Sequence, residues 1–509
     1  MRLGTVARVL GLWFVFLAGF PAPAEQQEFC IAGIVRNAAT GEPMRRAGVT
    51  IPEAADLTNA GGGFRFCGLS PGSYYVNAEK PGFAETGIRL TVGPSREDLD
   101  LRLEPLSVIR GKVTDGDDQP LEKAAVQLLA AHIVAGRRAV SVAAETVTDD
   151  RGEYRIAQVA AGRYYLRAAG WSGDASRDTR VAFVPAYYGG GADLAMASAL
   201  QIDPGHDLRA DFEIKSETGY HISGTVAGLS ATPPAKIELL DSEREPIAVS
   251  ARLDPATGRF GIDSVPQGSY TVRIAQEADP RQRVGELALH VNGDIEQAAV
   301  RMSSLPALRG VMRFSDSGAD QRKTPPSCSI RLWPAGTWFT ESGTLDVATE
   351  PDGTFVLESV PPGPYRIHMD CAGAYVAQAR MGDADLPPGG EFSVPAGSTV
   401  PSMEAVLASD GGTVEVSPEE GAQGPAWVLL LPVSGNELQL RVAQMRKKAK
   451  FSGVAPGDYE VYAWTGLPEG FAYADLQSRQ SWPAGAEQIH IGARETVAVK
   501  VKIVTGELH

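Results

Sequence analysis

Seven histidines are the residues best suited to metal or acid–base chemistry, and their spacing argues against a zinc peptidase. A catalytic zinc needs several protein ligands around one metal, with one position left open for water. No His-Glu-x-x-His motif occurs, and the histidines are scattered along the chain. They are His132, His206, His221, His290, His368, His490 and His509. We therefore predict no catalytic residue, no metal site, no cofactor and no enzymatic activity.

One serine formally matches a nucleophile motif. Residues 68–72 read Gly-Leu-Ser-Pro-Gly, the pattern of the Gly-x-Ser-x-Gly nucleophile elbow. That motif presents its serine on a sharp turn from a strand into a helix. Ser70 lies instead in a turn that recurs along the chain without a serine, and the residues after it resemble a strand. We interpret Ser70 as a turn residue.

Clustered aspartates could offer oxygen ligands to calcium. They occur at residues 115–118 and at Asp149 and Asp150, without the spacing of an EF-hand loop. Aspartate is also common in turns because its side chain bonds to the backbone nearby. Turn formation is the favoured interpretation, and calcium binding is the alternative.

The elements that carry these residues belong to a fivefold repeat. A short apolar strand runs into a turn that ends in Gly-x-Tyr, at residues 72–74, 162–164, 268–270, 363–365 and 457–459. Successive glycines lie 90, 106, 95 and 94 residues apart. This period is too long for a solenoid unit and suits a whole small domain. We predict that each tyrosine buries its ring and bonds the backbone of its own turn.

Each unit alternates apolar and polar residues in about seven short runs, with hardly any helical periodicity. A glycine precedes an aromatic residue by two positions in the first four units, at Gly62, Gly152, Gly258 and Gly353. We expect positive φ at these glycines, as tight hairpins require. The pattern predicts an all-β protein, a tandem array of about five antiparallel Greek-key β-sandwich domains.

The repeat sets the expected domain boundaries. Residues 1–24 form a signal peptide, with Arg2 and Arg8 before an apolar stretch and small residues at 22–24. Sandwiches follow at 25–105, at 106–216 with an aromatic insertion, at 217–305, at 306–407 and at 408–509. The fifth is degenerate, because Lys447 and Ala449 replace the glycine and the aromatic residue. An uncleaved membrane anchor is the alternative to the signal peptide.

The net charge limits the classes of binding partner that we expect, and the cysteine content bears on the cellular compartment. The formal net charge is −15, which disfavours nucleic acid as a partner. No later segment is apolar enough to span a membrane, so we expect none in the mature chain. The four cysteines form two near-neighbour pairs, Cys30 with Cys67 and Cys328 with Cys371. In an exported protein these predict two disulfides; four buried thiols are the alternative.

The first unit resembles a known family. The residues that carry the resemblance are Gly33-Ile34-Val35, Thr40-Gly41-Glu42-Pro43, Ala47-Gly48-Val49, Gly63-Phe64-Arg65-Phe66 and Leu69-Ser70-Pro71-Gly72-Ser73-Tyr74. They look like a carboxypeptidase regulatory-like domain, and the later units are similar with decreasing fidelity. The resemblance implies a transthyretin-like β-sandwich, a fold classed with carbohydrate-binding-like domains. Such domains occur beside metallocarboxypeptidases and, without an enzyme, in bacterial envelope proteins.

Aromatic residues outside the repeat are the candidates for ligand binding. Rigid, exposed rings bind sugars and form hot spots in protein interfaces. Two lie in the insertion of the second unit and the others crowd the fifth. The candidates are Tyr187, Tyr188, Trp464, Phe471, Tyr473 and Trp482. Aromatic residues at strand positions belong more often to the core, so core packing is the favoured interpretation and ligand binding is the alternative.

The leading hypothesis is a secreted or extracytoplasmic binding, adhesion or scaffold protein of the bacterial cell envelope, in the periplasm or at the cell surface. Its partner would be an unknown protein or polysaccharide of the envelope or its surroundings. Carbohydrate binding through the exposed aromatic residues is the second hypothesis. A remote third is an accessory protein to an envelope hydrolase or peptidase.

Overall fold

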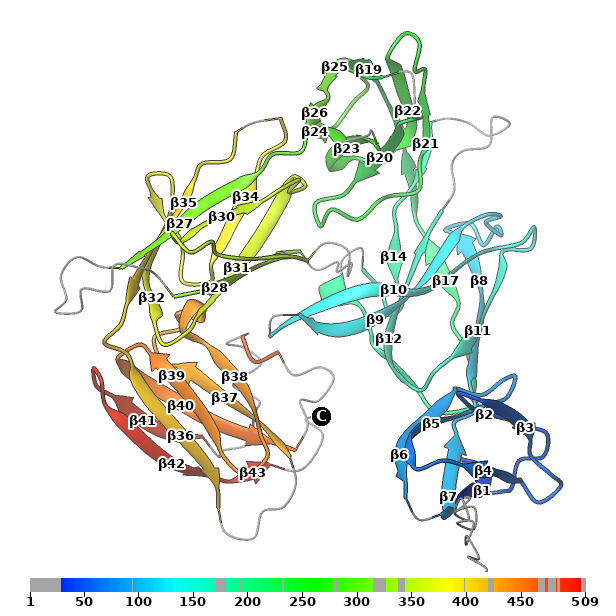
Figure 1. Ribbon diagram of the computed structural model, residues 1–509. Helices are drawn as coiled ribbons and strands as arrows, with labels where there is room; N and C mark the ends of the chain where they lie inside the picture. The colour runs from blue at the N-terminus through cyan, green and yellow to red at the C-terminus, as the bar shows by residue number, and fades with distance from the viewer. Residues whose placement is uncertain are drawn as a thin grey trace, which may run out of the picture. The chain divides into compact units, whose positions relative to one another are not determined.

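The computed structural model describes residues 29–93, 95–134, 136–170, 180–191, 194–230, 233–277, 282–314, 326–336, 344–397, 399–419, 425–465, 472–474, 482 and 486–504. The expected signal peptide at 1–24 lies outside the described residues. The chain divides into two compact units, Met1–Leu106 and Ser107–His509. The described chain is built of strands that form five β-sandwiches (Figure 1).

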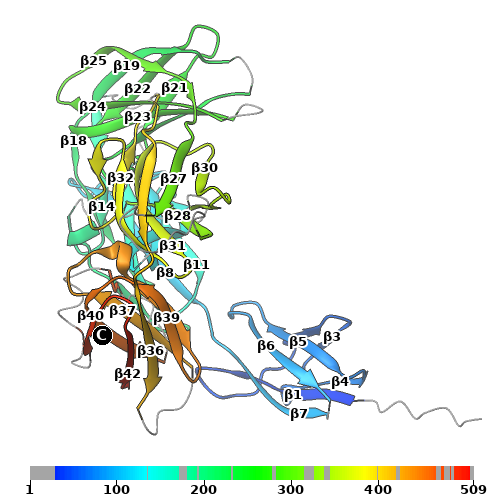
Figure 2. The same cartoon turned by 60° about the vertical axis from the view of Figure 1, so that its left-hand side comes forward.

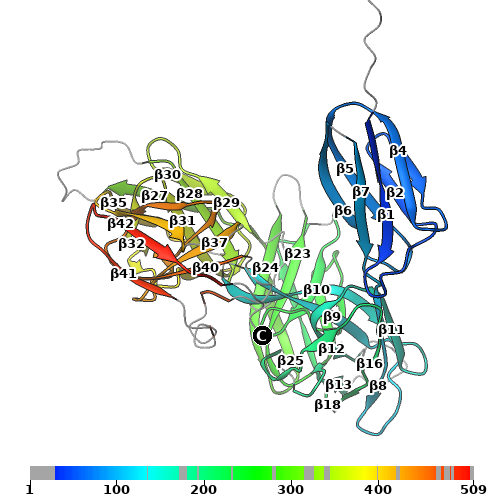
Figure 3. The same cartoon turned by 90° about the horizontal axis from the view of Figure 1, so that it is seen from below.

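The first sandwich packs two sheets face to face, which Figure 2 shows as two layers. One sheet has the order β4-β1-β7, and Figure 3 shows β1 between its two neighbours. The other has the order β3-β2-β5-β6. The strands are β1 (Phe29–Asn37), β2 (Gly48–Ile51), β3 (Ala54–Leu57), β4 (Gly63–Leu69), β5 (Gly72–Glu79), β6 (Thr86–Val92) and β7 (Arg96–Leu103).

The second sandwich has a longer hairpin and additional short strands. Its elements are β8 (Ser107–Asp115), β9 (Ala125–Val134), β10 (Arg137–Val147), β11 (Glu153–Val159), β12 (Gly162–Ala169), β13 (Val181–Phe183), β14 (Ala186–Tyr187), the 3-10 helix η1 (Leu194–Met196), β15 (Leu200–Ile202), β16 (Asp207–Arg209), β17 (Phe212–Ile214) and β18 (Ser216–Thr218). One sheet orders β11-β8-β16, with β17 also on β8. The other orders β10-β9-β12-β14, with β15 also on β12, and β13 pairs with β18 separately.

The third sandwich has the sheet orders β21-β22-β19-β25 and β20-β23-β24-β26. Its strands are β19 (Tyr220–Ala227), β20 (Lys236–Leu240), β21 (Ser250–Leu253), β22 (Arg259–Val265), β23 (Gly268–Gln276), β24 (Arg283–Val291), β25 (Ile295–Arg301) and β26 (Ser303–Ser304).

The fourth sandwich has the orders β30-β27-β35-β32-β33 and β29-β28-β31-β34. Its strands are β27 (Leu308–Phe314), β28 (Cys328–Pro334), β29 (Leu345–Ala348), β30 (Thr354–Leu357), β31 (Gly363–Cys371), β32 (Tyr375–Met381), β33 (Ala384–Asp385), β34 (Glu391–Val394) and β35 (Met403–Ala408).

The fifth sandwich has the orders β39-β36-β42 and β38-β37-β40-β41, with β43 also on β40. Its elements are β36 (Gly412–Pro418), β37 (Ala426–Pro432), the 3-10 helix η3 (Glu437–Gln439), β38 (Arg441–Met445), β39 (Ala449–Val454), β40 (Gly457–Trp464), β41 (Glu487–Ile491), β42 (Thr496–Val501) and β43 (Ile503–Val504).

In each sandwich the first strand has a parallel neighbour that the expectation of antiparallel sheets did not include, and the fifth sandwich has a further parallel pair, β40 with β43. The first strand of every unit pairs antiparallel with its neighbour on one side and parallel with a closing strand on the other. The closing strand is β7, β16 with β17, β25, β35 or β42. The two ends of each unit therefore lie side by side in one sheet.

A glycine in the first strand makes this close pairing possible. Gly33, Gly111, Gly224 and Gly310 each lie directly opposite an aromatic residue of the neighbouring strand. A Cβ atom at Gly224 would lie 2.0 Å from the carbonyl oxygen of Ala298 on the closing strand. At Gly310 it would lie 2.3 Å from the ring of Phe355. Any side chain here would collide with the backbone or the ring.

In the fifth sandwich the glycine, the facing aromatic residue and the register shift are all replaced, which supports a link between the three features. There, Val416 occupies the glycine position and faces Ala449 in place of an aromatic residue. Its parallel pair runs in continuous register from Thr413 to Pro418. In the first and third sandwiches the register shifts beside the glycine, a β-bulge in the closing strand. A small facing residue thus replaces the ring where a β-branched residue replaces the glycine.

The turns follow the sequence-based expectations. Gly62, Gly152, Gly258 and Gly353 have φ of 75°, 72°, 67° and 85°. The tyrosine hydroxyl donates to the carbonyl oxygen four residues earlier in three units: Tyr74 to Ser70, Tyr365 to Pro361 and Tyr459 to Ala455, at 3.1, 3.0 and 2.9 Å. Both disulfides form as paired in the sequence, Cys30 with Cys67 and Cys328 with Cys371. The alternative of four free thiols is wrong.

Within residues 107–509, a turn of the third sandwich contacts both the second and the fourth. Arg167 on β12 has a side chain only 3% exposed, and its guanidinium lies 3.5 Å from Glu245 and 3.8 Å from Asp241. From the same turn, Arg244 donates to the carbonyl oxygen of Pro362 at 3.2 Å. Removing one partner of such a buried pair strands the other charge away from water. These contacts hold the three sandwiches together.

The first prediction concerns the tyrosine hydroxyl bonds. Tyr459 is 2% exposed, so Tyr459→Phe leaves the Ala455 carbonyl without its side-chain donor. We expect a loss of about 1–2 kcal/mol in the free energy of unfolding, measured by urea denaturation. Tyr270→Phe is the matched control, because the described chain shows no partner for its hydroxyl, and it should cost less than about 0.5 kcal/mol. Equal losses in the two variants would contradict this role.

The second prediction concerns pH. Burial raises the pKa of Glu245 from 4.5 to about 7, while Arg167 opposes the shift. Between these values the folded state holds a proton that the unfolded state has released, so stability falls as pH rises through this window. Burial also raises the pKa of Asp241, with the same sign.

Glu245→Gln removes this titration from the junction. The free energy of unfolding is measured by urea denaturation near pH 4.5 and near pH 8. We expect it to fall between these two pH values by about 1–3 kcal/mol less in the variant than in the wild type. Glu243→Gln, at an exposed position of the same turn, is the control and should keep the wild-type dependence. An unchanged slope in Glu245→Gln would rule out this carboxyl as its source.

Candidate binding site

The aromatic candidates of the second sandwich are not free, exposed rings. Tyr187 is only 6% exposed and packs with Leu129 and Val140. Tyr188 packs edge-on against Phe212, with ring centroids 6.0 Å apart. The insertion folds back as β14 against β12, so that neighbouring side chains point to opposite faces. The interpretation as a core residue is therefore confirmed for Tyr187, and the structure places both rings in packed clusters.

The fifth-sandwich candidates do come together, but largely as a core. Trp464 is 1% exposed, stacks on Tyr462 with centroids 5.2 Å apart and meets Trp482 edge-on at 5.4 Å. Tyr473 and Trp482 pack against the same cluster and are partly buried. They cover the outer face of β40, which is why Trp464 is buried rather than exposed. Phe471 lies outside the described residues.

Tyr473 also lines a polar pocket between the fourth and fifth sandwiches, which we call the arginine pocket. It has a volume of about 280 Å³. Its floor is the outer face of β28 and β31, and its wall comes from η3, β38 and residues 473–474. Lining residues that matter for chemistry are Arg331, Trp333, Arg366, His368, Asp370, Glu437, Arg441 and Tyr473.

Strand register brings the floor residues together. Arg331 lies opposite His368, and Trp333 lies opposite Arg366. Because Ile330, Leu332, Ile367 and Met369 point into the core, the residues between them point outward. The ring of Trp333 lies 5.9 Å from that of His368 and 5.8 Å from the Arg331 guanidinium carbon. The floor thus combines an aromatic face with positive charge.

The wall of the arginine pocket is held by polar contacts with its surroundings. Arg441 donates to the carbonyl oxygens of Leu438 and Leu440 at 3.0 and 3.1 Å. Glu437 forms an ion pair with Arg137, from the β9–β10 hairpin of the second sandwich. The same hairpin accepts a hydrogen bond from the Ala474 backbone at the Gly136 carbonyl, at 2.7 Å. The pocket is therefore lined by two sandwiches, and a third contacts residues of its wall.

Burial and charge set the electrostatics of this site. Burial, with help from Arg441 and Arg331, lowers the pKa of His368 to about 4, so its ring is neutral at pH 7. Burial also lowers the pKa of the Arg441 guanidinium, which remains charged at that pH. Burial raises the pKa of Glu437, against the pull of Arg137. The arrangement offers guanidinium donors and a neutral imidazole beside an aromatic ring.

Sequence reasoning missed Arg331 and Trp333, although a signal was present. The run from Cys328 to Leu332 alternates buried and exposed residues, so Trp333 falls on the outward register. An aromatic residue at an outward strand position, two residues from an arginine, marks a face that is covered or that binds. The alternation predicts the strand, and the same alternation places Arg331 and Trp333 on its outer face.

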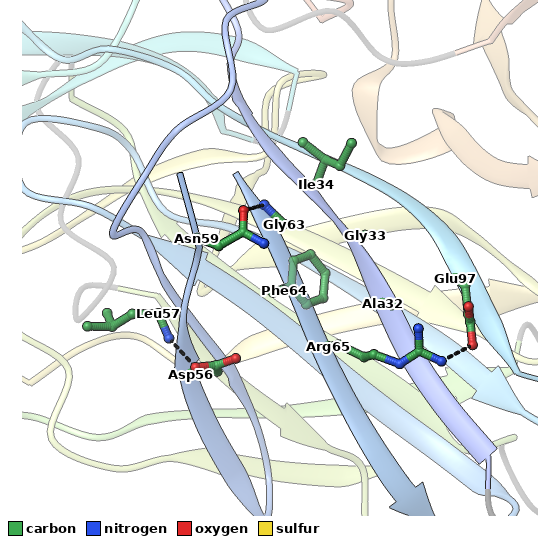
Figure 4. A pocket seen from close by; sticks show the side chains of 10 residues that line it. All are labelled: Ala32, Gly33, Ile34, Asp56, Leu57, Asn59, Gly63, Phe64, Arg65 and Glu97. Carbon is green, nitrogen blue, oxygen red and sulfur yellow. Dashed lines mark hydrogen bonds and ion pairs between the residues drawn. The ribbon is translucent and has the colours of Figure 1, made fainter. Parts of the chain in front are cut away.

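Two further pockets have polar groups that are already paired. In the first sandwich, a pocket of about 370 Å³ is lined by Arg65 and Glu97, which bond at 2.8 Å, and by Asn59, which accepts from the Gly63 backbone (Figure 4). A cleft of about 1160 Å³ lies between the third and fourth sandwiches, where Arg244 pairs with Glu286.

The serine and the aspartates that could have served catalysis or calcium binding lie in turns and stabilise them. Ser70 precedes β5, a strand and not a helix, and its carbonyl receives the Tyr74 hydroxyl. The carboxylates of Asp115 and Asp149 accept backbone N–H groups two and four residues ahead, at 2.9 Å. Within the described residues, no group of His, Cys, Asp or Glu is placed to hold a metal ion. The helices described are also too short to cross a membrane.

Solved structures with some likeness to this chain include three bacterial proteins. The Bacillus anthracis TIE protein is 12% identical, with 76% of this chain and 75% of that chain covered and a TM-score of 0.18. The Streptococcus agalactiae minor pilin GBS52 is 14% identical (37% and 96%; TM-score 0.21). The Bacillus cereus major pilin subunit BcpA is 9% identical (75% and 100%; TM-score 0.17). Likeness at this level carries no argument about this chain.

A comparison with curated proteins gave no match. A family model does match, over residues 30–104 and again over 108–214, and its description is the carboxypeptidase regulatory-like domain. These are the segments that form the first two sandwiches, and the first is the segment on which the sequence resemblance rests. The chain thus carries two carboxypeptidase regulatory-like domains, followed by three further β-sandwiches.

Proposed function

We propose that this chain is a non-enzymatic, extracytoplasmic binding or scaffold protein of the bacterial cell envelope. The observation that carries the proposal is the set of polar contacts between sandwiches in residues 107–509. Arg167 meets Glu245, Arg244 meets the Pro362 carbonyl, and Arg137 meets Glu437. These residues lie outside the repeated glycine, aromatic and tyrosine positions. A repeat that folds each domain separately has been adapted to join four of them.

The extracytoplasmic location is supported by the two disulfides, because such bonds persist in oxidising compartments. Ligand binding is supported by the arginine pocket, which lies where two sandwiches meet and whose wall contacts a hairpin from a third. Clefts between domains are common places for ligand sites. Of the aromatic candidates, Tyr473 is the one that lines this pocket.

The third prediction tests the location. When cells that express the full chain are lysed directly into denaturant, a thiol-reactive polymer should not label the four cysteines. After reduction all four should be labelled, giving a stepwise loss of gel mobility. A variant that lacks residues 1–24 should remain in the reducing cytosol and be labelled without reduction. Labelling of the full chain without reduction would contradict an extracytoplasmic location.

A further inference from the structure

The arginine pocket carries more positive charge than its own carboxylates neutralise. Arg366 is paired with Glu391, with N–O distances of 2.8 and 2.5 Å, and Glu437 is paired with Arg137. Arg331 makes no ion pair with any carboxylate in the described part of the chain. Arg441 contacts backbone carbonyls, which carry no net charge. Asp370 is the remaining carboxylate of the lining.

Two guanidinium groups are therefore left beside one carboxylate. Arg331 is exposed, whereas Arg441 is partly buried, where an unmatched charge is costly. Arginine matches a carboxylate with two parallel N–H bonds, so an anion is the complementary ligand. Asp370 lies on the same strand as His368 and is exposed, so water can still solvate it. The charge balance alone thus favours a ligand with one negative group.

The other residues that line the arginine pocket favour a ligand that contains a ring. Trp333 and Tyr473 offer apolar faces on which a flat or puckered ring can stack. The neutral His368 imidazole and the Asp370 carboxylate can donate to and accept from hydroxyl groups. A volume of about 280 Å³ lies just below the roughly 300–1,000 Å³ typical of small-molecule pockets, which suits a ligand no larger than one sugar ring.

We infer that the arginine pocket binds a sugar acid, a single pyranose unit that carries one carboxylate. Arg331 and Arg441 hold the carboxylate, Trp333 stacks on the ring, and His368 and Asp370 bond its hydroxyl groups. This inference rests on the proposed binding function and names the ligand class of the same site.

Calorimetric titration of the full-length protein tests the inference with three probes. D-glucuronate carries both the ring and the carboxylate, D-glucose lacks the charge, and acetate lacks the ring. We expect saturable binding of glucuronate with Kd near 1 mM or below, and binding at least about tenfold weaker for glucose and for acetate. Glucose binding as tightly as glucuronate, or acetate doing so, would overturn the assignment, as would no saturation by about 10 mM glucuronate.

Variants place the ligand in this pocket. Arg331→Gln should weaken glucuronate binding about tenfold and leave the weak affinity for glucose unchanged. Trp333→Ala should weaken both sugars. Arg313→Gln is the matched control, because Arg313 is an exposed arginine of the same sandwich that pairs with Glu404, away from the pocket. Equal effects of Arg313→Gln and Arg331→Gln would overturn the proposal.

Unchanged urea denaturation of each variant shows that folding is intact. Failure of the ligand inference is distinguishable from failure of the proposed function, because the thiol-labelling result does not depend on the pocket. A chain that is oxidised in the cell but does not bind glucuronate would leave the envelope location standing and remove the sugar acid.

Discussion

In each of the first four sandwiches, a glycine of the first strand packs closely against both neighbouring strands, and the fold of the sandwich depends on this close packing. The glycine lies under an aromatic ring on one side and beside the closing strand on the other. This lets the beginning and the end of a unit share one sheet, so each domain closes on itself. At Gly224, even one added carbon would lie 2.0 Å from a backbone oxygen. The fifth sandwich satisfies the same constraint with Val416 facing Ala449.

Because every unit is closed in this way, the contacts that join units come from residues the repeat does not share. Arg167, Arg137 and Arg244 all lie outside the shared positions and reach across to a neighbouring sandwich. The arginine pocket forms where these sandwiches meet. Its floor belongs to the fourth sandwich and its wall to the fifth, and Arg137 of the second sandwich pairs with Glu437 of the wall. Shared residues fold the domains, and unshared residues join them and line the arginine pocket.

The sequence was sufficient for features that depend on local chemistry. Gly62 and its equivalents adopt positive φ because a hairpin needs it, and the cysteines pair within their units. The parallel strand pairs were not predictable, since period-two alternation is the same in parallel and antiparallel strands. For Tyr187 and Trp464 the sequence left core and binding roles open, because most of the residues that bury them are distant in sequence. Trp333 could have been found from its outward register, but its pocket depends on how two sandwiches meet.

A double-mutant cycle on Gly310 and Phe355 tests the constraint most directly. Hydrogen exchange in the full-length chain measures the free energy of opening of β27. A side chain at Gly310 collides chiefly with the Phe355 ring, 2.3 Å away. We predict that Gly310→Val and Phe355→Ala each destabilise β27, and that the double variant loses less than the sum by about 1 kcal/mol or more. That result would reproduce the Val416–Ala449 pair of the fifth sandwich. Losses that add within about 0.5 kcal/mol would contradict the account.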